Sequence, residues 1–296
     1  MFQTISQTAM LHWVGLIATL LFINELSRSS KWFSVLFYFV IPIPLTFLVW
    51  IHTGTDPANT DINTWFHWVK LYSVLIAVVG FTLMRFTALG ENRWMKFFPA
   101  FILFINILEA VLRDFELGAA GGGIFHWMNG IAGVFSAITL CGMSGVFIDK
   151  QHKRDLLWPD MTLFWIIAYD VWNFTYIYNC VPEHAFYGLA VLLACTIPAV
   201  FIKKGTWVQA RALTLAAWMM YIFTFPGVVT SAASRVDAVD STGPNMALSA
   251  LSLLLNGAFF VYHFWRVYTQ RKFTLGDEIY SDTAGFKNIA QFRTAT

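Results

Sequence analysis

One acid lies in the middle of a long apolar stretch, Asp170 within residues 161–180. At the midpoint of a bilayer an ionisable group costs roughly 2.5 to 3.5 kcal/mol on insertion scales, so it is usually paired or placed beside water. Helical spacing groups polar and aromatic side chains on one face: Tyr169, Trp172, Tyr176 and Asn179 form one stripe, and Asp170 and Asn173 form the next. No basic residue lies within a turn or two of Asp170, which favours a binding or proton-carrying role for this acid.

Two other acids lie within apolar stretches. Glu25 is followed by Arg28 three residues later, so a local ion pair accounts for it. Glu109 is deeper and shares a helical face with Asn106 and Arg113. The Glu109-to-Arg113 spacing favours an ion pair that would neutralise the acid without any function. A structural role and a role for Glu109 and Asn106 as a second polar station therefore both stay open.

Histidines form the second group with chemical potential. Five of the seven, His12, His52, His67, His126 and His184, lie at or near the ends of apolar stretches on one side, and all of these except His52 are the candidate ligands. If these side chains converge at one depth, they could hold a metal ion or a haem. No HxxH or HxxxH spacing ties any two of them to one helix, so histidines that face lipid head groups are the simpler interpretation. The sequence predicts no particular cofactor.

Nine apolar segments must position these residues, and each is long enough to cross a bilayer core of about 30 Å. They are residues 9–27, 33–51, 66–86, 97–113, 126–148, 161–180, 184–202, 211–230 and 246–268. The sequence therefore predicts an all-α membrane bundle of about nine transmembrane helices over residues 1–272. Residues 273–296 are polar and are predicted to form a cytoplasmic tail.

The basic residues are distributed unevenly between the joints of these segments. Of the 19 Lys and Arg residues, Lys70, Arg113 and Arg235 fall on one side, and the other 16 fall on the opposite side or in the tail. The positive-inside rule then places the N-terminus outside and the C-terminus in the cytoplasm. An odd number of spans satisfies that orientation.

A weak repeat and several helix breakers add detail. The triplets Leu11-His12-Trp13, Phe66-His67-Trp68 and Phe125-His126-Trp127 each open an odd-numbered helix, which permits four helical hairpins plus one helix. Aromatic belts at membrane interfaces imitate such a repeat without any duplication. Prolines 42, 44, 198 and 226 interrupt helices, and broken helices often line a cavity. Glycines 130, 133, 142 and 145 predict a small face on segment 126–148.

Composition excludes several classes of protein. The chain is 57% hydrophobic and 12% charged, whereas soluble domains carry about 25% charged residues. The net charge is +2 without a basic groove, so nucleic acid is not an expected partner. The three cysteines give no disulfide framework or CxxC site. Walker A, GxSxG and HExxH patterns are absent from the sequence.

Several local motifs resemble those of a bacterial family of polytopic membrane proteins of unknown function. They are Phe66-His67-Trp68-Val69-Lys70, Ile107-Leu108-Glu109-Ala110-Val111, Met128-Asn129-Gly130-Ile131-Ala132-Gly133, and Ile167-Ala168-Tyr169-Asp170 with Trp172-Asn173. The resemblance covers most of the chain and implies a location in the bacterial inner membrane. It implies no activity, ligand or catalytic residue.

These observations favour a transporter or channel for a small polar solute or a cation, coupled to protons through Asp170. The pathway would then include Asp170, Asn173, Tyr169, Tyr176, Glu109 and Asn106. An alternative is a membrane oxidoreductase or other enzyme with haem or metal on the histidines. A third is a sensor or structural subunit whose polar interior only fixes helix register. The lipid bilayer is the expected partner, and the sequence leaves oligomerisation open.

Overall fold

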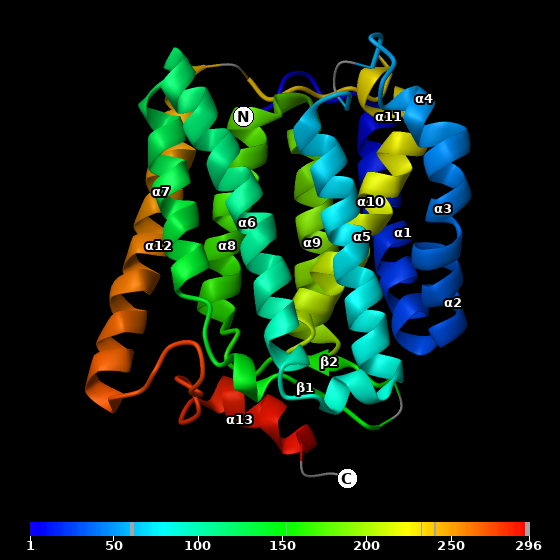
Figure 1. Cartoon of the computed structure of the whole chain (residues 1–296). Helices are drawn as coiled ribbons and strands as arrows, with labels where there is room; N and C mark the ends of the chain where they lie inside the picture. Colours follow the sequence, from blue (N-terminus) through cyan, green and yellow to red (C-terminus); the bar gives the residue numbers. More distant parts are fainter. Residues whose placement is uncertain (60–61, 152, 232, 240, 294–296) are drawn as a thin grey trace.

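The computed structural model describes residues 1–59, 62–151, 153–231, 233–239 and 241–293, and for Val229 and Thr230 the backbone alone. It is a bundle of roughly parallel helices with almost no β-structure (Figure 1). The short bridge between Phe2 and Ala238 and the N-terminus lie at one end of the bundle, and the C-terminal helix lies at the other.

A helix occupies each of the nine apolar stretches. The long helices are α1 (Gln7–Ser29), α5 (Trp65–Phe86), α6 (Phe98–Leu117), α7 (Ile124–Ile138), α8 (Leu163–Cys180), α9 (Ala185–Phe201), α10 (Trp207–Thr224) and α12 (Thr242–Gln270). The strands are β1 (Phe147–Ile148) and β2 (Leu156–Leu157). Short helices are α11 (Gly227–Thr230) and α13 (Ala284–Ala290), with 3₁₀ turns at Ala88–Glu91, Met95–Phe97, Met143–Gly145, Pro182–His184 and Gln291–Arg293.

The second helix, Lys31–Thr53, is irregular. It consists of α2 (Lys31–Val35), α3 (Pro42–Leu45) and α4 (Ile51–Thr53), separated by π-helical turns at Leu36–Val40 and Thr46–Trp50. The amide of Ile41 donates to the carbonyl of Leu36, five residues back. Pro42 and Pro44 lack the amide that a regular turn needs, which explains the widened turns around them.

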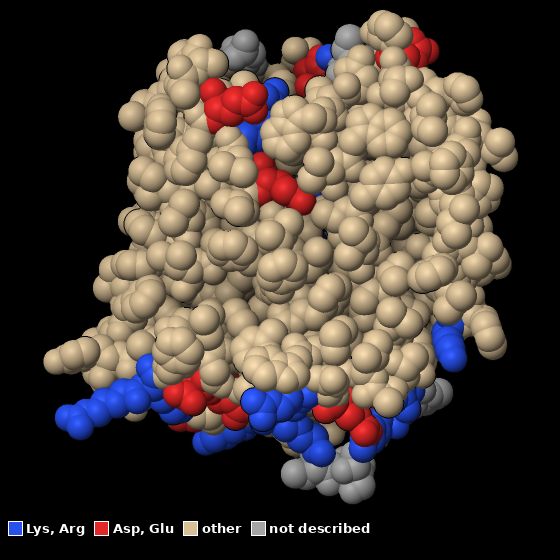
Figure 2. Space-filling view, viewed as in Figure 1, with Lys and Arg blue, Asp and Glu red and all other residues tan. Residues whose placement is uncertain are grey.

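Six of the helical segments among the described residues are long and apolar enough to cross a membrane, which indicates a membrane protein. They are Gln7–Ser29, Lys31–Thr53, Trp65–Phe86, Met95–Gly122, Pro182–Phe201 and Thr242–Gln270. Figure 2 agrees with this, because charged side chains gather at the two ends of the molecule around a broad, mostly uncharged band. Nine spans and their orientation stay predictions.

Two of the remaining helices lie inside the bundle. Most residues of α8 and α10 are buried, and α10 packs against α1, α5 and α9, whereas α8 packs against α7, α9 and α12. Because these helices contact protein on most sides, they carry polar residues such as Asn173 and Arg211 that lower their mean hydropathy. Length and hydropathy alone therefore miss the helices that build the polar interior.

Helix α7 is shorter than its predicted segment. It ends at Ile138, and Gly142 takes a left-handed conformation with φ of 63° in the turn that follows. Gly130 and Gly133 do face neighbouring helices, because a Cβ there would meet Phe115, and Val111 with Trp172, respectively. The prediction of one continuous small face over 126–148 is wrong for Gly142 and Gly145, which lie beyond the helix.

The buried Arg85 links several elements at the end of the bundle that carries β1 and β2. The guanidinium of Arg85 donates to the carbonyls of Ser27, Arg28, Lys153 and Arg154. It thereby joins the last turn of α1, whose carbonyls have no partner within the helix, to the β1–β2 hairpin. The described part of the predicted tail, residues 273–293, is folded onto the same end, with Ile279 and Tyr280 fully buried. Residues 294–296 lie outside the described part of the chain.

Candidate functional site

A polar cavity of about 70 Å³ lies inside the bundle between α5, α6, α8, α9 and α10. Its volume exceeds the roughly 10 to 15 Å³ that one water needs, so it has room for several waters or a small ion. Its polar lining residues are His67, Lys70, Asn106, Tyr169, Asn173, Tyr176, His184 and Arg211. Four of the six predicted pathway residues are among them, namely Asn106, Tyr169, Asn173 and Tyr176.

Helix α8 supplies three of these side chains in one stripe. Tyr169, Asn173 and Tyr176 are four and three residues apart, so they lie on one face of the helix. The same face continues to Cys180 at the end of α8. The cavity lining therefore combines Tyr169 and Tyr176 from one predicted stripe with Asn173 from the next. The other members of those stripes, Trp172, Asn179 and Asp170, are not among the described lining residues.

Lys70 reaches the cavity from α5. Its ammonium lies 2.6 Å from Oε2 of Glu109 and donates to the backbone carbonyl and the side-chain oxygen of Asn106, at 3.0 and 3.1 Å. The predicted ion pair of Glu109 with Arg113 is not formed, because Arg113 pairs instead with Glu116, three residues further on. The charge of Glu109 is thus neutralised by Lys70 on α5, and Glu109 is not among the described residues that line the cavity.

Arg211 is the second cation of the cavity. It is 6% exposed, and its Nη2 donates to Oδ1 of Asn173 at 2.9 Å, while the guanidinium carbon lies 6.0 Å from the ring centroid of Tyr169. No carboxylate of the described residues forms an ion pair with it, and its buried Nε has no hydrogen-bond partner. The hydroxyl of Tyr176 is also buried without a partner. These are donors that face a space large enough for a ligand.

Asp170 is not among the described residues that line this cavity. Its Oδ2 accepts a hydrogen bond of 2.6 Å from the hydroxyl of Thr196 on α9, which in turn accepts one from the indole of Trp207. The other carboxylate oxygen, Oδ1, is buried without a hydrogen-bond partner. The structure therefore places Asp170 behind the cavity wall, next to α9.

The four candidate histidines are not brought together as one cluster. The rings of His67 and His184 lie 5.2 Å apart at the cavity, and Nδ1 of His67 is 2.7 Å from the hydroxyl of Thr64. His126 lies elsewhere, with Nδ1 2.9 Å from Oδ1 of Asp114. His12 lines a separate pocket. A haem or metal site that uses all four has no support in this arrangement.

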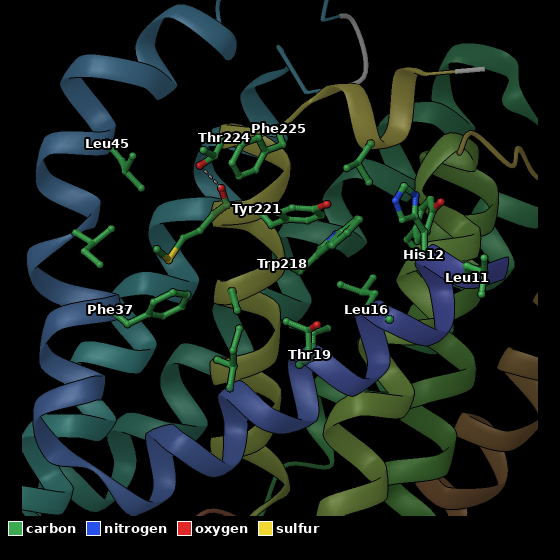
Figure 3. Close-up of a pocket in the computed structure, with 18 residues that line it drawn as sticks. Leu11, His12, Leu16, Thr19, Phe37, Leu45, Trp218, Tyr221, Thr224 and Phe225 are labelled. Atoms are coloured by element: carbon green, nitrogen blue, oxygen red, sulfur yellow. Dashed lines mark hydrogen bonds between the residues drawn. The ribbon is translucent and has the colours of Figure 1, made fainter. Parts of the chain in front are cut away.

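That separate pocket is apolar and has a volume of about 480 Å³. Figure 3 shows its lining: Leu11, His12, Leu16 and Thr19 from α1, Phe37 and Leu45 from the irregular second helix, and Trp218, Tyr221 and Thr224 from α10. The broken helix with its two prolines does line a cavity, as expected. Trp218 contributes to this pocket and to the polar cavity, so the two spaces share one wall.

Sequence reasoning missed four important residues. Lys70 and Arg211 were assigned to the ends of helices from the charge pattern, yet both are buried and face one cavity. The sequence spacing does not link Asp114 or Cys180 to His126, yet both side chains contact it. A signal for Asp114 is present, because it precedes the glycine turn Gly118–Gly122 by one helical turn and His126 follows that turn by another.

No curated protein and no solved structure matches this chain. A family profile does match, and it extends over nearly the whole chain, from residue 3 to residue 292. Its description names no activity, ligand or partner. The chain therefore belongs to this family of unknown function, DUF5692.

Proposed function

We propose that this protein is an integral membrane protein that binds a small organic anion in the polar cavity and carries it across the bilayer. The observation that carries the proposal is Arg211, a buried guanidinium that faces the cavity without a carboxylate partner among the described residues. A buried charge is normally paired or neutralised, and an arginine fork fits a carboxylate or phosphate in two parallel hydrogen bonds.

The rest of the lining supports an anion over a cation. Lys70 and Arg211 both face the cavity, and no acid is among the described lining residues. The Tyr176 hydroxyl offers a further donor, and the rings of Phe66, Tyr169 and Trp218 offer apolar surface. A small carboxylate has both a charged group and an apolar part, so it fits this mixture of donors and rings.

Charge balance favours coupling to a proton. Glu109 pairs with Lys70, and Asp170 forms no ion pair with Arg211 but is near enough for their charges to interact, so the four groups are formally neutral before an anion enters. An anion alone would leave an uncompensated negative charge in a low-dielectric interior, which is costly. Glu109 and Asp170 each keep one carboxylate oxygen without a hydrogen-bond partner, so either could take up the balancing proton.

The topology that accompanies this proposal has nine spans, with the end that carries β1, β2 and α13 in the cytoplasm. The predicted excess of Lys and Arg at that end supports this orientation, and Figure 2 shows basic side chains gathered there. A bacterial inner membrane is the location that the resemblance implies.

The test is a binding and uptake experiment on the purified protein. Thermal shifts in detergent with acetate, lactate, phosphate and potassium chloride compare wild type, Arg211→Gln and the exposed control Lys31→Gln. A bound anion at a hundredfold excess over Kd raises the free energy of unfolding by about 2.7 kcal/mol. We expect the shift in wild type and Lys31→Gln and its loss in Arg211→Gln.

Uptake of the bound anion into proteoliposomes, with an acidic exterior, tests the coupling. Asp170→Asn and Glu109→Gln are compared with wild type, and we expect one of them to abolish the response of uptake to the pH gradient. An anion shift that persists in Arg211→Gln would remove the anion proposal. Stabilisation by potassium ions with every counter-anion would favour the cation alternative.

A further inference from the structure

Three potential metal ligands converge at the end of the bundle where α6, α7 and α8 meet. They are Asp114 on α6, His126 on α7 and Cys180 at the end of α8. One ligand atom from each lies within 4.8 Å of the other two. Among the described residues, this is the group of His, Cys, Asp or Glu side chains close enough together to hold a metal ion. Asp114 and His126 are buried, and Cys180 is half-buried, so the set is enclosed but not sealed.

The contacts point to one shared position. Oδ1 of Asp114 lies 2.9 Å from Nδ1 of His126 and 3.1 Å from Sγ of Cys180, and that sulfur lies 3.6 Å from the same Nδ1. A tetrahedral zinc ion with Zn–N near 2.0 Å and Zn–S near 2.3 Å holds its ligand atoms about 3.3 to 3.6 Å apart. Outward movements of a few tenths of an ångström in two of the three distances would therefore admit the ion.

The same geometry argues against a nucleophilic triad. In a Cys–His–Asp triad the acid contacts one ring nitrogen and the thiol contacts the other, so that the imidazole can relay a proton. Here both groups face Nδ1 of His126. Because Nδ1 is the nitrogen near both groups, the imidazole cannot relay a proton between Cys180 and Asp114. Donor atoms of three side chains that face one point are suited to binding a cation.

The buried charge of Asp114 is an independent reason to expect a cation at this position. Asp114 is fully buried, and no Lys or Arg forms an ion pair with it in the described part of the chain, since the adjacent Arg113 pairs with Glu116. Its hydrogen-bonding neighbours are His126, Asn129 and Cys180. A buried carboxylate without a permanent cation is unusual, and a divalent ion would compensate it.

The surroundings resemble the outer hydrogen bonds of metal sites. Nδ2 of Asn129 donates to Oδ2 of Asp114 at 2.7 Å, and Oδ1 of Asn129 accepts from the hydroxyl of Ser252 at 2.8 Å. This chain from α12 through α7 fixes the orientation of the carboxylate, as partners of metal ligands commonly do. The Tyr176 hydroxyl, one turn before Cys180 on the same face, is buried without a partner and offers a further polar group.

From these contacts we infer that Asp114, His126 and Cys180 bind a divalent transition-metal ion, with zinc as the ion that their donor types suit best. Binding would release the thiol proton of Cys180 to solvent as the thiolate coordinates the ion. The position lies outside the set of residues that line the anion cavity, apart from Tyr176, so the inference stands without the proposed transport.

The experiment is a cobalt and zinc titration of the full-length protein after treatment with a chelator. We expect one Co²⁺ per chain with a near-ultraviolet thiolate-to-metal charge-transfer band, which Zn²⁺ displaces. Cys180→Ser should lose the band and bind Zn²⁺ at least about tenfold more weakly. Cys195→Ser, which removes another thiol of the bundle, should retain both.

A second measurement uses the wild type alone, so it does not depend on how the variants fold. Alkylation of each cysteine by N-ethylmaleimide is followed by mass spectrometry with and without Zn²⁺. Protection of Cys180 while Cys141 and Cys195 react unchanged supports the site. Absence of metal binding, a charge-transfer band that persists in Cys180→Ser, or alkylation of Cys180 at the same rate with Zn²⁺ would each overturn it.

Discussion

Lys70 and Glu109 form an ion pair of 2.6 Å between α5 and α6, with both side chains about nine-tenths buried. The pair ties the two helices together beside the polar cavity and leaves Oε1 of Glu109 without a partner. A buried pair contributes little net stability when intact, but removal of one member leaves an uncompensated charge.

The first prediction concerns this pair. Lys70→Met should lower the free energy of unfolding by about 3 to 5 kcal/mol, because the Glu109 charge stays buried without its partner. The double variant Lys70→Met/Glu109→Gln should regain much of that loss, which denaturation in detergent would measure. The exposed pair Lys150–Glu91 is the control, and Lys150→Met should leave stability unchanged. Additive losses in the double variant would refute a coupled pair.

The second prediction concerns the close packing of α7. A Cβ at Gly133 would lie 2.5 Å from Val111 and 2.6 Å from Nε1 of Trp172. Gly133→Ala should therefore destabilise the protein by about 1 to 3 kcal/mol through overpacking. Gly257→Ala in α12 is matched, because its nearest atom lies 3.9 Å away, and it should be neutral or slightly stabilising. Equal melting temperatures for the two variants would contradict this packing.

The third prediction concerns pH. The pKa of Asp160 is raised from 3.8 to about 6. Burial is the largest cause, a hydrogen bond from the backbone of Tyr280 opposes it, and the charge of the nearby Glu278 adds to the rise. Between about pH 4 and 6 the folded state keeps a proton that the unfolded state has lost. Raising the pH through this window therefore weakens the folded state by up to about 3 kcal/mol.

Asp160→Asn removes that titration. Relative to wild type, the variant should gain stability as pH rises from 4 to 6 and keep a constant advantage above 6. Melting temperatures from pH 4 to 8 would show this difference, with the exposed Glu91→Gln as the control for a lost surface acid. A difference between wild type and Asp160→Asn that does not vary with pH would show that Asp160 does not titrate there.

The fourth prediction concerns Asp155, an acid whose pKa is lowered rather than raised. Burial opposes ionisation of Asp155, but two hydrogen bonds from Arg28, the charge of Arg28 and a third hydrogen bond from Gln209 lower its pKa overall. Its contribution to stability should be present above the ordinary carboxyl pKa and lost as pH falls through the lowered one. Asp155→Asn should therefore cost about 1 to 3 kcal/mol at pH 7, because the buried Arg28 loses its buried partner and keeps only the partly exposed Glu25. Unfolding curves at pH 7 that coincide with those of wild type would be incompatible with this role.

Periodicity predicted what depends on one helix at a time. The polar and aromatic character of the α8 face that carries Tyr169 and Tyr176 follows from spacing, and so do the apolar stretches. Spacing did not separate Asn173, which lines the cavity, from Asp170, which does not. The local pair of Glu25 and Arg28 also follows, and the structure confirms it at 2.8 Å. These features could be derived because the residues that interact are neighbours in sequence.

Contacts between helices could not be predicted in this way. Spacing favoured Arg113 as the partner of Glu109, whereas tertiary packing supplies Lys70, 39 positions earlier in the sequence, and leaves Arg113 to Glu116. Asp114 and Cys180 meet His126 only after three helices associate. Helix α7 ends at Ile138 and the left-handed Gly142 follows in the turn, whereas hydropathy alone extends the helix to residue 148, because apolar residues continue past the turn.

Trp218 lines both the apolar pocket and the polar cavity, so the two spaces approach each other at this residue. A smaller side chain at this position would bring the two spaces closer to a single chamber with a cationic end and an apolar end. An amphiphile could then place its head group beside Arg211 and its tail beside Phe37 and Leu45. The size of the side chain at position 218 would then decide whether the bundle admits only a compact ion or also an amphiphile that enters from the bilayer.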